Sequence, residues 1–200
     1  IARVLEQQVH QTVLEINLDA ISHNLNIFRS YLDPSTKIMA MVKAFAYGSG
    51  SSEIASFLEY HRVGYLTVAY ADEGVGLRNS GVTLPVMVMN PDPSAAELMI
   101  KYNLEPELYS FTSFRSFVTV AERHGLIGYP VHLKIDTGMH RLGFLPDEVD
   151  DLVKEIRKRE CIRIISVFSH LSASEDPRFD DFTRKQVEMF LEVAGQIREA

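Results

Sequence analysis

The chain has 200 residues, of which 46% are apolar, and this is enough to bury one substantial core. Its net charge of -7 argues against binding to nucleic acid or to an acidic membrane, and no apolar run is long enough to span a bilayer. A single cysteine excludes an internal disulfide and fits a reducing compartment, so we expect a cytoplasmic protein. The first residues contain neither an initiator methionine nor an apolar secretory core, and we expect the chain to be a piece of a longer protein.

Strand and helix patterns alternate along the chain at the spacing of strand–helix–strand units. The predicted strands are 13–18, 37–42, 65–69, 84–89, 104–109, 130–136 and 162–169. Asp19 would cap the first helix, which places Leu25 and Phe28 on one apolar stripe. Repeated units of this kind predict a parallel sheet covered by helices.

The fold class that fits these units is an α/β barrel of the (β/α)8 type, whose active site lies at the carboxyl ends of the strands. An open doubly wound sheet is the alternative, but its glycine-rich phosphate turn is missing. If strand 13–18 belongs elsewhere, about six strand–helix units finish by residue 200. A closed barrel needs eight, so we expect an incomplete barrel.

Lys43 is the first candidate for chemistry, because it follows the apolar strand 37–42 and precedes a loop of small residues. Burial favours the neutral amine, which is the nucleophilic form of lysine. On residue type alone, however, a lysine whose stem lies along the strand and whose ammonium reaches water is the better interpretation. The neighbouring residues change that balance.

The segment Val42-Lys43-Ala44-Phe45-Ala46-Tyr47-Gly48 resembles the pyridoxal phosphate (PLP) attachment signature of the alanine racemase family. The resemblance implies that Lys43 holds the cofactor covalently and that Tyr47 bonds its phosphate. Phe45 stands where Asn or Asp is usual, and Ser49 stands where His is usual. Both positions neighbour the reacting groups, so they put fine tuning in doubt and leave the assignment itself in place.

Three further segments resemble the same family in the same order. Residues 12–24 look like its opening strand and helix, and residues 134–144 match its K-x-D-T-G-M-x-R-L-G block closely. Residues 169–174 follow strand 162–169, where the family has a cofactor-contacting histidine. The motifs at Lys43, at 136–141 and at His170 all follow predicted strand ends, as the active site of a barrel requires.

The resemblance also assigns roles to single residues. Arg141 would face the phenolic oxygen of PLP, and His170 would contact the cofactor. Lys134 would be carbamylated, as the matching lysine is in many alanine racemases, and would orient Arg141. The backbone of Met139 would lie near the substrate carboxylate, where Arg141 would also act. Asp136 is either a supporting group or the cap of the Asp-Thr-Gly turn, and common turn chemistry favours the cap.

Strand 130–136 has a polar face made of His132, Lys134 and Asp136. In an antiparallel sheet such a face would simply be solvated. A parallel sheet covered by helices directs it instead toward a closed site, where the charges must be paired.

The resemblance therefore implies that residues 1–200 are the N-terminal PLP-binding barrel domain of a racemase that interconverts L- and D-alanine for bacterial peptidoglycan. It also implies a C-terminal β domain, absent from this chain, whose tyrosine acts on the partner subunit of a homodimer. This fragment alone should then be inactive or nearly so, and the full-length protein could carry a fused cell-wall ligase domain. Another PLP barrel, such as an amino-acid decarboxylase or a non-catalytic PLP carrier, and a scaffold domain without cofactor remain open alternatives. The histidines do not have the spacing of a metal site, and the chain has only one cysteine, so we expect no metal site.

Overall fold

The computed structural model describes residues 12–199, which divide into two compact units with the boundary after Lys37. In the first unit the described helix is α1 (Leu18–Ser30). Asn17 caps it, because its side-chain oxygen accepts a hydrogen bond from the amide of Ala20 at 3.0 Å. Asp19, which the sequence predicted as the cap, lies in the first turn, where its charge favours the helix dipole.

The predicted strand 13–18 is wrong. Residues 12–17 have no regular structure, their side chains are exposed, and Leu18 already belongs to α1. Alternating apolar residues make a strand only where a neighbouring strand supplies hydrogen bonds, and no described strand pairs with this segment. Part of the motif 12–24 is thus helical, and residues 1–11 lie outside the described part of the chain.

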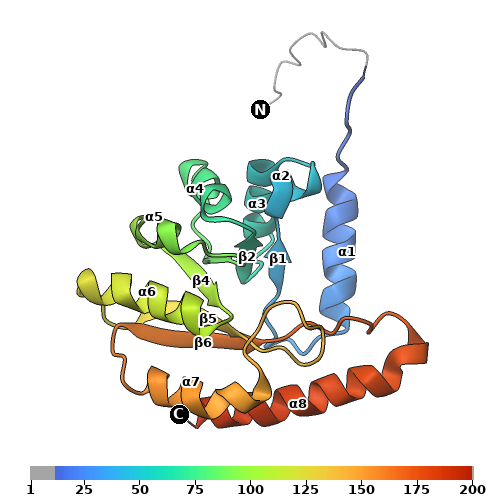
Figure 1. Ribbon diagram of the computed structural model, residues 1–200. Helices are drawn as coiled ribbons and strands as arrows, with labels where there is room; N and C mark the ends of the chain where they lie inside the picture. Colours follow the sequence, from blue (N-terminus) through green and yellow to red (C-terminus); the bar gives the residue numbers. More distant parts are fainter. Residues whose placement is uncertain (1–11, 200) are drawn as a thin grey trace. The chain divides into compact units, whose positions relative to one another are not determined.

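The second unit contains a parallel sheet in which the strands follow one another in chain order (Figure 1). Its strands are β1 (Met39–Met41), β2 (Tyr65–Val68), β3 (Val86–Val88), β4 (Leu104–Leu108), β5 (Tyr129–Lys134) and β6 (Ile162–Phe168). All five neighbouring pairs are parallel. The other six predicted strands are therefore confirmed, with ends that differ by one to a few residues.

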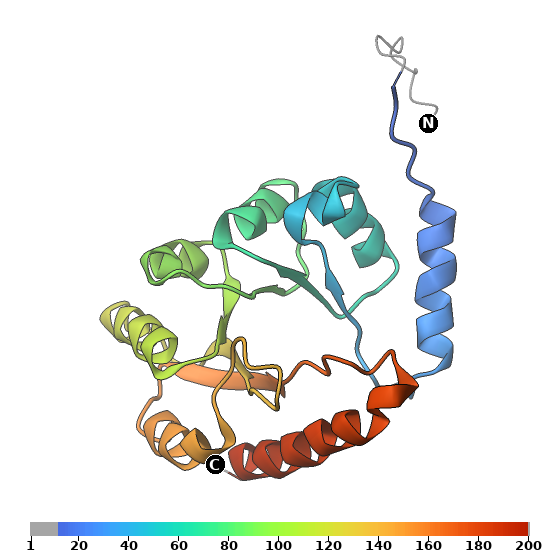
Figure 2. The same ribbon diagram turned by 45° about the vertical axis from the view of Figure 1, so that its right-hand side comes forward.

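Helices connect the strands, and those of the second unit form an arc around the outer side of the sheet (Figure 2). They are α2 (Lys43–Tyr47), α3 (Ser51–Tyr60), α4 (Ala71–Asn79), α5 (Ala96–Lys101), α6 (Phe111–Arg123), α7 (Val149–Ile156) and α8 (Asp180–Arg198), with short 3-10 turns at Pro93–Ala95, Pro146–Glu148 and Pro177–Phe179. None of the helices within 12–199 has the length and apolar character needed to cross a membrane.

The two faces of the sheet differ in chemistry. Leu66, Leu104 and Leu133 are fully buried, and a Cβ atom on Gly74 of α4 would lie 2.8 Å from Leu104 Cδ1, so this apolar face packs against the helices. The alternate residues of β4 and β5 are polar and contact one another across the other face, as described below. Strand alternation thus separates a core on the helix side from a polar interior.

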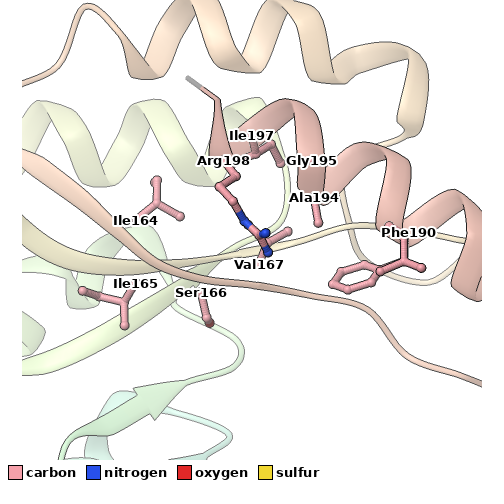
Figure 3. A pocket seen from close by; sticks show the side chains of 10 residues that line it. Ile164, Ile165, Ser166, Val167, Phe190, Ala194, Gly195, Ile197 and Arg198 are labelled. Atoms are coloured by element: carbon pink, nitrogen blue, oxygen red, sulfur yellow. The ribbon is translucent and has the colours of Figure 1, made fainter.

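The barrel is not closed, because β1 and β6 are the two edges of the sheet in the described chain. Beside β6 runs a groove of about 610 Å³ toward α8, lined by side chains that include Ile165, Phe190 and Arg198 (Figure 3). The fold class is thus an α/β sheet with the strand order of a (β/α)8 barrel, of which six strands are present.

Candidate active site

A cavity of about 380 Å³ opens beside the carboxyl ends of several strands of the sheet. Three basic side chains predicted from two motifs line this cavity: Lys43 from the first motif, and Lys134 and Arg141 from the block 134–144. The remaining lining residues are Ala69, Tyr70, Met89, Asn90, Glu107 and Leu142. Residues almost a hundred positions apart are adjacent because parallel strands end at the same side of the sheet.

Lys43 is half-buried and begins a short turn with left-handed backbone geometry. Four successive residues other than glycine, Ala44 to Tyr47, have φ angles between 51° and 57°. This conformation costs about 1–2 kcal/mol per residue relative to the right-handed one. It is held by hydrogen bonds from the amide of Gly48 to the carbonyl of Ala44 at 3.1 Å and from Gly50 to Phe45 at 3.0 Å. A strained turn next to the candidate nucleophile is typical of a functional site.

Glu73, at the start of α4, fixes this turn from the side. One carboxylate oxygen accepts from the amide of Ala44 and the other from the amide of Ala69, both at 2.7 Å. The residue therefore joins the loop after β1 to the loop after β2, directly at the cavity. Glu73 was not predicted as a site residue, since an acidic residue in the first turn of a helix is ordinary capping chemistry.

Asp136 caps the turn that follows β5. Its carboxylate accepts hydrogen bonds from the amides of Gly138 at 2.9 Å and His140 at 3.0 Å. Burial alone would raise the pKa of Asp136, but these hydrogen bonds outweigh it and the pKa lies below its usual value. The turn-cap interpretation that the sequence favoured agrees with these contacts.

The loop that carries Arg141 then returns to the end of β5. The amide of Phe144 donates to the carbonyl of Lys134, and the amide of Asp136 donates to the carbonyl of Phe144, both at 2.9 Å. Gly143 makes this approach possible, since a Cβ atom there would lie 2.3 Å from the amide nitrogen of Asp136. The loop is therefore tied to the strand that carries Lys134.

Lys134 is buried against a carboxylate that the sequence analysis did not single out. Its Nζ atom lies 3.4 Å from Oε1 of Glu107 on β4 and 5.5 Å from the centre of the Phe168 ring. Burial raises the pKa of Glu107 to about 7, although the charges of Lys134 and Arg141 oppose the shift. The alternation Glu105-Pro106-Glu107 in a strand that is buried at every position was the signal that could have identified it.

A second set of polar side chains, which are hydrogen-bonded to one another, lies on the same strands one layer away from the cavity. His132 forms two side-chain hydrogen bonds. Its Nε2 atom lies 2.8 Å from Glu105 Oε2, and its Nδ1 atom lies 2.7 Å from the Ser166 hydroxyl. The Tyr65 hydroxyl donates to the same Glu105 oxygen at 3.1 Å. Burial and the nearby Glu105 carboxylate raise the pKa of Tyr65 to about 12, so its phenol stays a donor. No residue of this network lines the cavity.

Three other predicted site residues lie outside the cavity lining. Tyr47 is 67% exposed, and Met139 is half-buried in the turn after β5. The side chain of His170 is exposed, whereas its carbonyl accepts a hydrogen bond from Gln186 Nε2 at 3.1 Å. Gln186 also donates to Thr137 Oγ1 at 3.3 Å, and thereby links the loops after β5 and β6 to α8. The roles given to Tyr47, Met139 and His170 stay predictions.

Comparison with known proteins explains this arrangement. Residues 16–200 match the family described as "Alanine racemase, N-terminal domain". The chain belongs to the alanine racemase N-terminal domain family. An alanine racemase of Synechocystis sp. is 33% identical over 94% of this chain and 50% of its own length, and an amino-acid racemase of Enterococcus faecalis is 33% identical over 90% of this chain and 25% of its own.

A solved structure shows the same fold. The alanine racemase of Clostridium difficile 630 superposes with a TM-score of 0.85 at 34% identity, over 92% of this chain and 48% of that chain. The chain thus spans about half the length of the alanine racemases it matches. The predicted barrel class and the predicted family are both confirmed.

Alanine racemases are PLP-dependent, and the cavity fits that cofactor. PLP is an anionic aromatic aldehyde, so its site needs an amine for covalent attachment and an excess of positive charge. Lys43 supplies the amine, and Lys134 and Arg141 supply two cationic groups against the single carboxylate of Glu107 among the described lining residues. A volume of about 380 Å³ lies in the range usual for cofactor sites.

Proposed function

We propose that the full-length protein containing this chain is a PLP-dependent alanine racemase, and that residues 1–200 are its N-terminal cofactor-binding domain. The observation that carries the proposal is the convergence of Lys43, Lys134 and Arg141 on one cavity at the strand ends. Membership of the racemase family and the similarity to a solved alanine racemase support the same conclusion.

In this proposal Lys43 holds PLP covalently and Arg141 binds it as a fixed cation. Glu73 keeps the turn after Lys43 in place, because its carboxylate accepts a hydrogen bond from the amide of Ala44. Tyr47 and His170 remain proposed contacts for the cofactor on the strength of their motifs. The guanidinium of Arg141 suits its role, since it stays charged and donates in a fixed plane.

Racemisation requires removal of a proton from one face of the substrate Cα and delivery of a proton to the other. When bound, PLP withdraws electrons from Cα and makes its proton acidic. Lys43, once released by the incoming amino group of the substrate, would move the proton on one face. The base for the opposite face would come from the remainder of the protein, which we propose to be a β-rich domain of the partner subunit in a homodimer.

The physiological context is also part of the proposal. We infer a role in supplying D-alanine for peptidoglycan, a cytoplasmic location, and a possible fusion to a cell-wall ligase domain. The single cysteine and the family support the first two inferences. The relative from Enterococcus faecalis carries the broader name amino-acid racemase, so a racemase that accepts other small amino acids is the second candidate.

The test combines cofactor attachment with turnover in the full-length protein. Borohydride reduction followed by peptide mapping should place the reduced PLP adduct on Lys43, and Lys43→Ala should abolish both the adduct and the exchange of L- and D-alanine. Lys158→Ala, at an exposed lysine of the same chain, is the matched control and should retain both. A panel of small amino acids separates alanine from broader specificity. PLP binding without racemisation, or decarboxylation in its place, would refute the proposal.

A further inference from the structure

The carboxylate of Glu107 is the least satisfied polar group at the cavity. Its side chain is 0% exposed, and neither oxygen has a hydrogen-bond partner among the described residues. Glu107 Oε1 lies 3.4 Å from Lys134 Nζ, so the two side chains form an ion pair, but this pair does not have the geometry of a hydrogen bond. A buried carboxylate that lacks hydrogen bonds is destabilising, so its presence at a cavity wall indicates a task other than stability.

The surroundings of Glu107 indicate what that task is. Glu107 is the one acidic side chain among the described lining residues, and the positive charges of Lys134 and Arg141 both act on it. Lys134 is itself buried, with a side chain 4% exposed. The carboxylate therefore pairs directly with Lys134 on β5 and shares the cavity with Arg141, which the loop after β5 carries.

A carbamate on Lys134, which the family resemblance predicts, would occupy the same place. Starting from the protonated lysine, its formation joins Nζ to the carbon of CO2 and releases two protons, so the cation becomes an anion. That anion would lie beside the Glu107 carboxylate, and two buried negative charges at this distance repel. Above pH 7, where Glu107 is mostly ionised, its carboxylate already supplies one anion in the same cavity as Arg141.

We propose that Glu107 is the positioning anion of this site, and that Lys134 therefore stays an unmodified amine paired with it. Glu107 holds Lys134 and orients Arg141 toward the cofactor, in place of a carbamate. The orientation of Arg141 toward PLP rests on the proposed function, whereas the unmodified state of Lys134 does not.

The first experiment measures the chemical state of Lys134 in the full-length protein. The protein is equilibrated with ¹³C-bicarbonate, its carbamates are trapped by alkylation, and the peptide that contains Lys134 is analysed by mass spectrometry. We expect no carbamate in the wild type and a trapped carbamate in Glu107→Gln, where the competing charge is gone. A carbamate on Lys134 in the wild type would overturn the proposal. Glu188→Gln, at an exposed glutamate of α8, should behave as the wild type.

The second experiment measures PLP affinity by absorbance titration in bicarbonate-free buffer. At pH 8, Glu107→Gln should bind PLP about tenfold more weakly than the wild type, because the anion that pairs with Lys134 is lost. Added bicarbonate should restore binding in this variant and leave the wild type unchanged, while chloride should restore nothing. Equal affinity of the wild type and Glu107→Gln without bicarbonate would overturn the positioning role.

Two measures keep the result decisive. If Glu107→Gln does not fold, Glu107→Asp retains the anion with a shorter reach and should show weakened PLP binding without carbamate. If the wild type binds no PLP, the proposed function fails, yet the wild-type carbamate measurement still decides the state of Lys134.

Discussion

Two carboxylates of β4, Glu105 and Glu107, contact side chains of β5, but only Glu105 is hydrogen-bonded within the described part of the chain. Glu105 is bonded to His132 at 2.8 Å and to the Tyr65 hydroxyl at 3.1 Å, and His132 is bonded in turn to Ser166. Glu107, two residues further along the same strand, meets Lys134 at 3.4 Å and has no hydrogen bond to the described residues. The first pair lies in the interior of the sheet, and the second lines the cavity.

The contrast between Glu105 and Glu107 shows how one strand can serve both stability and function. A network in which each member is bonded rigidifies the sheet and fixes its interior. A charged pair left partly unsatisfied at a cavity keeps its electrostatic field available to a ligand. We therefore expect changes at the Glu105 pair to alter folding and changes at the Glu107 pair to alter cofactor binding.

Breaking the hydrogen-bond network of Glu105, His132, Tyr65 and Ser166 should have the largest effect on the stability of the protein. His132→Ala removes two hydrogen bonds, leaves a buried carboxylate poorly paired and opens a cavity, so the free energy of unfolding should fall by about 3–5 kcal/mol. Urea unfolding followed by circular dichroism measures the change. A loss under about 1 kcal/mol would show that the inner network does not stabilise the sheet and would remove the contrast between the pairs.

The second effect is a pH dependence of stability that arises from Glu107. Its folded pKa of about 7 exceeds the value of 4.5 for the free side chain, so the folded state holds the proton more tightly. This contribution is present below pH 4.5 and is lost as the pH rises through about 7, with a total change of about 3 kcal/mol. Unfolding curves between pH 5 and 8 should show the loss in the wild type and a flatter profile in Glu107→Gln. An identical slope in both would contradict the assignment.

A smaller loss of stability is expected for Glu73, which belongs to neither carboxylate pair but holds the turn beside the cavity. Glu73→Gln can still accept one hydrogen bond but cannot accept equally from Ala44 and Ala69, and it should destabilise the protein by about 1–2 kcal/mol. The strained turn at Lys43 should loosen first, which hydrogen exchange of the Ala44 amide measures. Exchange that is faster throughout β4 and β5 instead would mean that Glu73 supports the whole sheet.

The smallest stability effect is expected for removal of the outer pair as a unit. In the double variant Glu107→Gln, Lys134→Met both charges disappear together, so unfolding at pH 8 should change by about 1 kcal/mol or less in either direction. PLP titration of the same variant should nevertheless show weaker binding. If the double variant is as unstable as His132→Ala, the two pairs do not differ in kind.

Much of the fold could be predicted, because strand alternation and helix stripes are local in sequence. The apolar run 37–42 and the five predicted strands that follow it all form strands, and neighbours in the chain pair with one another in the sheet. The run 13–18 has the same local pattern and yet is no strand, since pairing is a tertiary property. Asn17 and Asp19 illustrate the same limit, because either can cap a helix and only the backbone geometry decides.

The site divides in the same way. Lys43, Lys134 and Arg141 were found from motifs, because their residue types and spacings are specific. Glu107 and Glu73 were not, since an acidic residue in a buried strand or in a first helical turn has no meaning until its neighbours are known. Lys134 lies 27 positions from Glu107, and Ala44 lies 29 positions from Glu73, so neither contact follows from a local pattern.

The family, six of the strands and the amine expected to carry the cofactor follow from residue types at fixed local spacing. Which charges share a cavity, and which carboxylate lacks hydrogen bonds, follow only from the folded arrangement. Burial and charge pairing depend on distances between separate strands, and these distances exist only after the chain has folded.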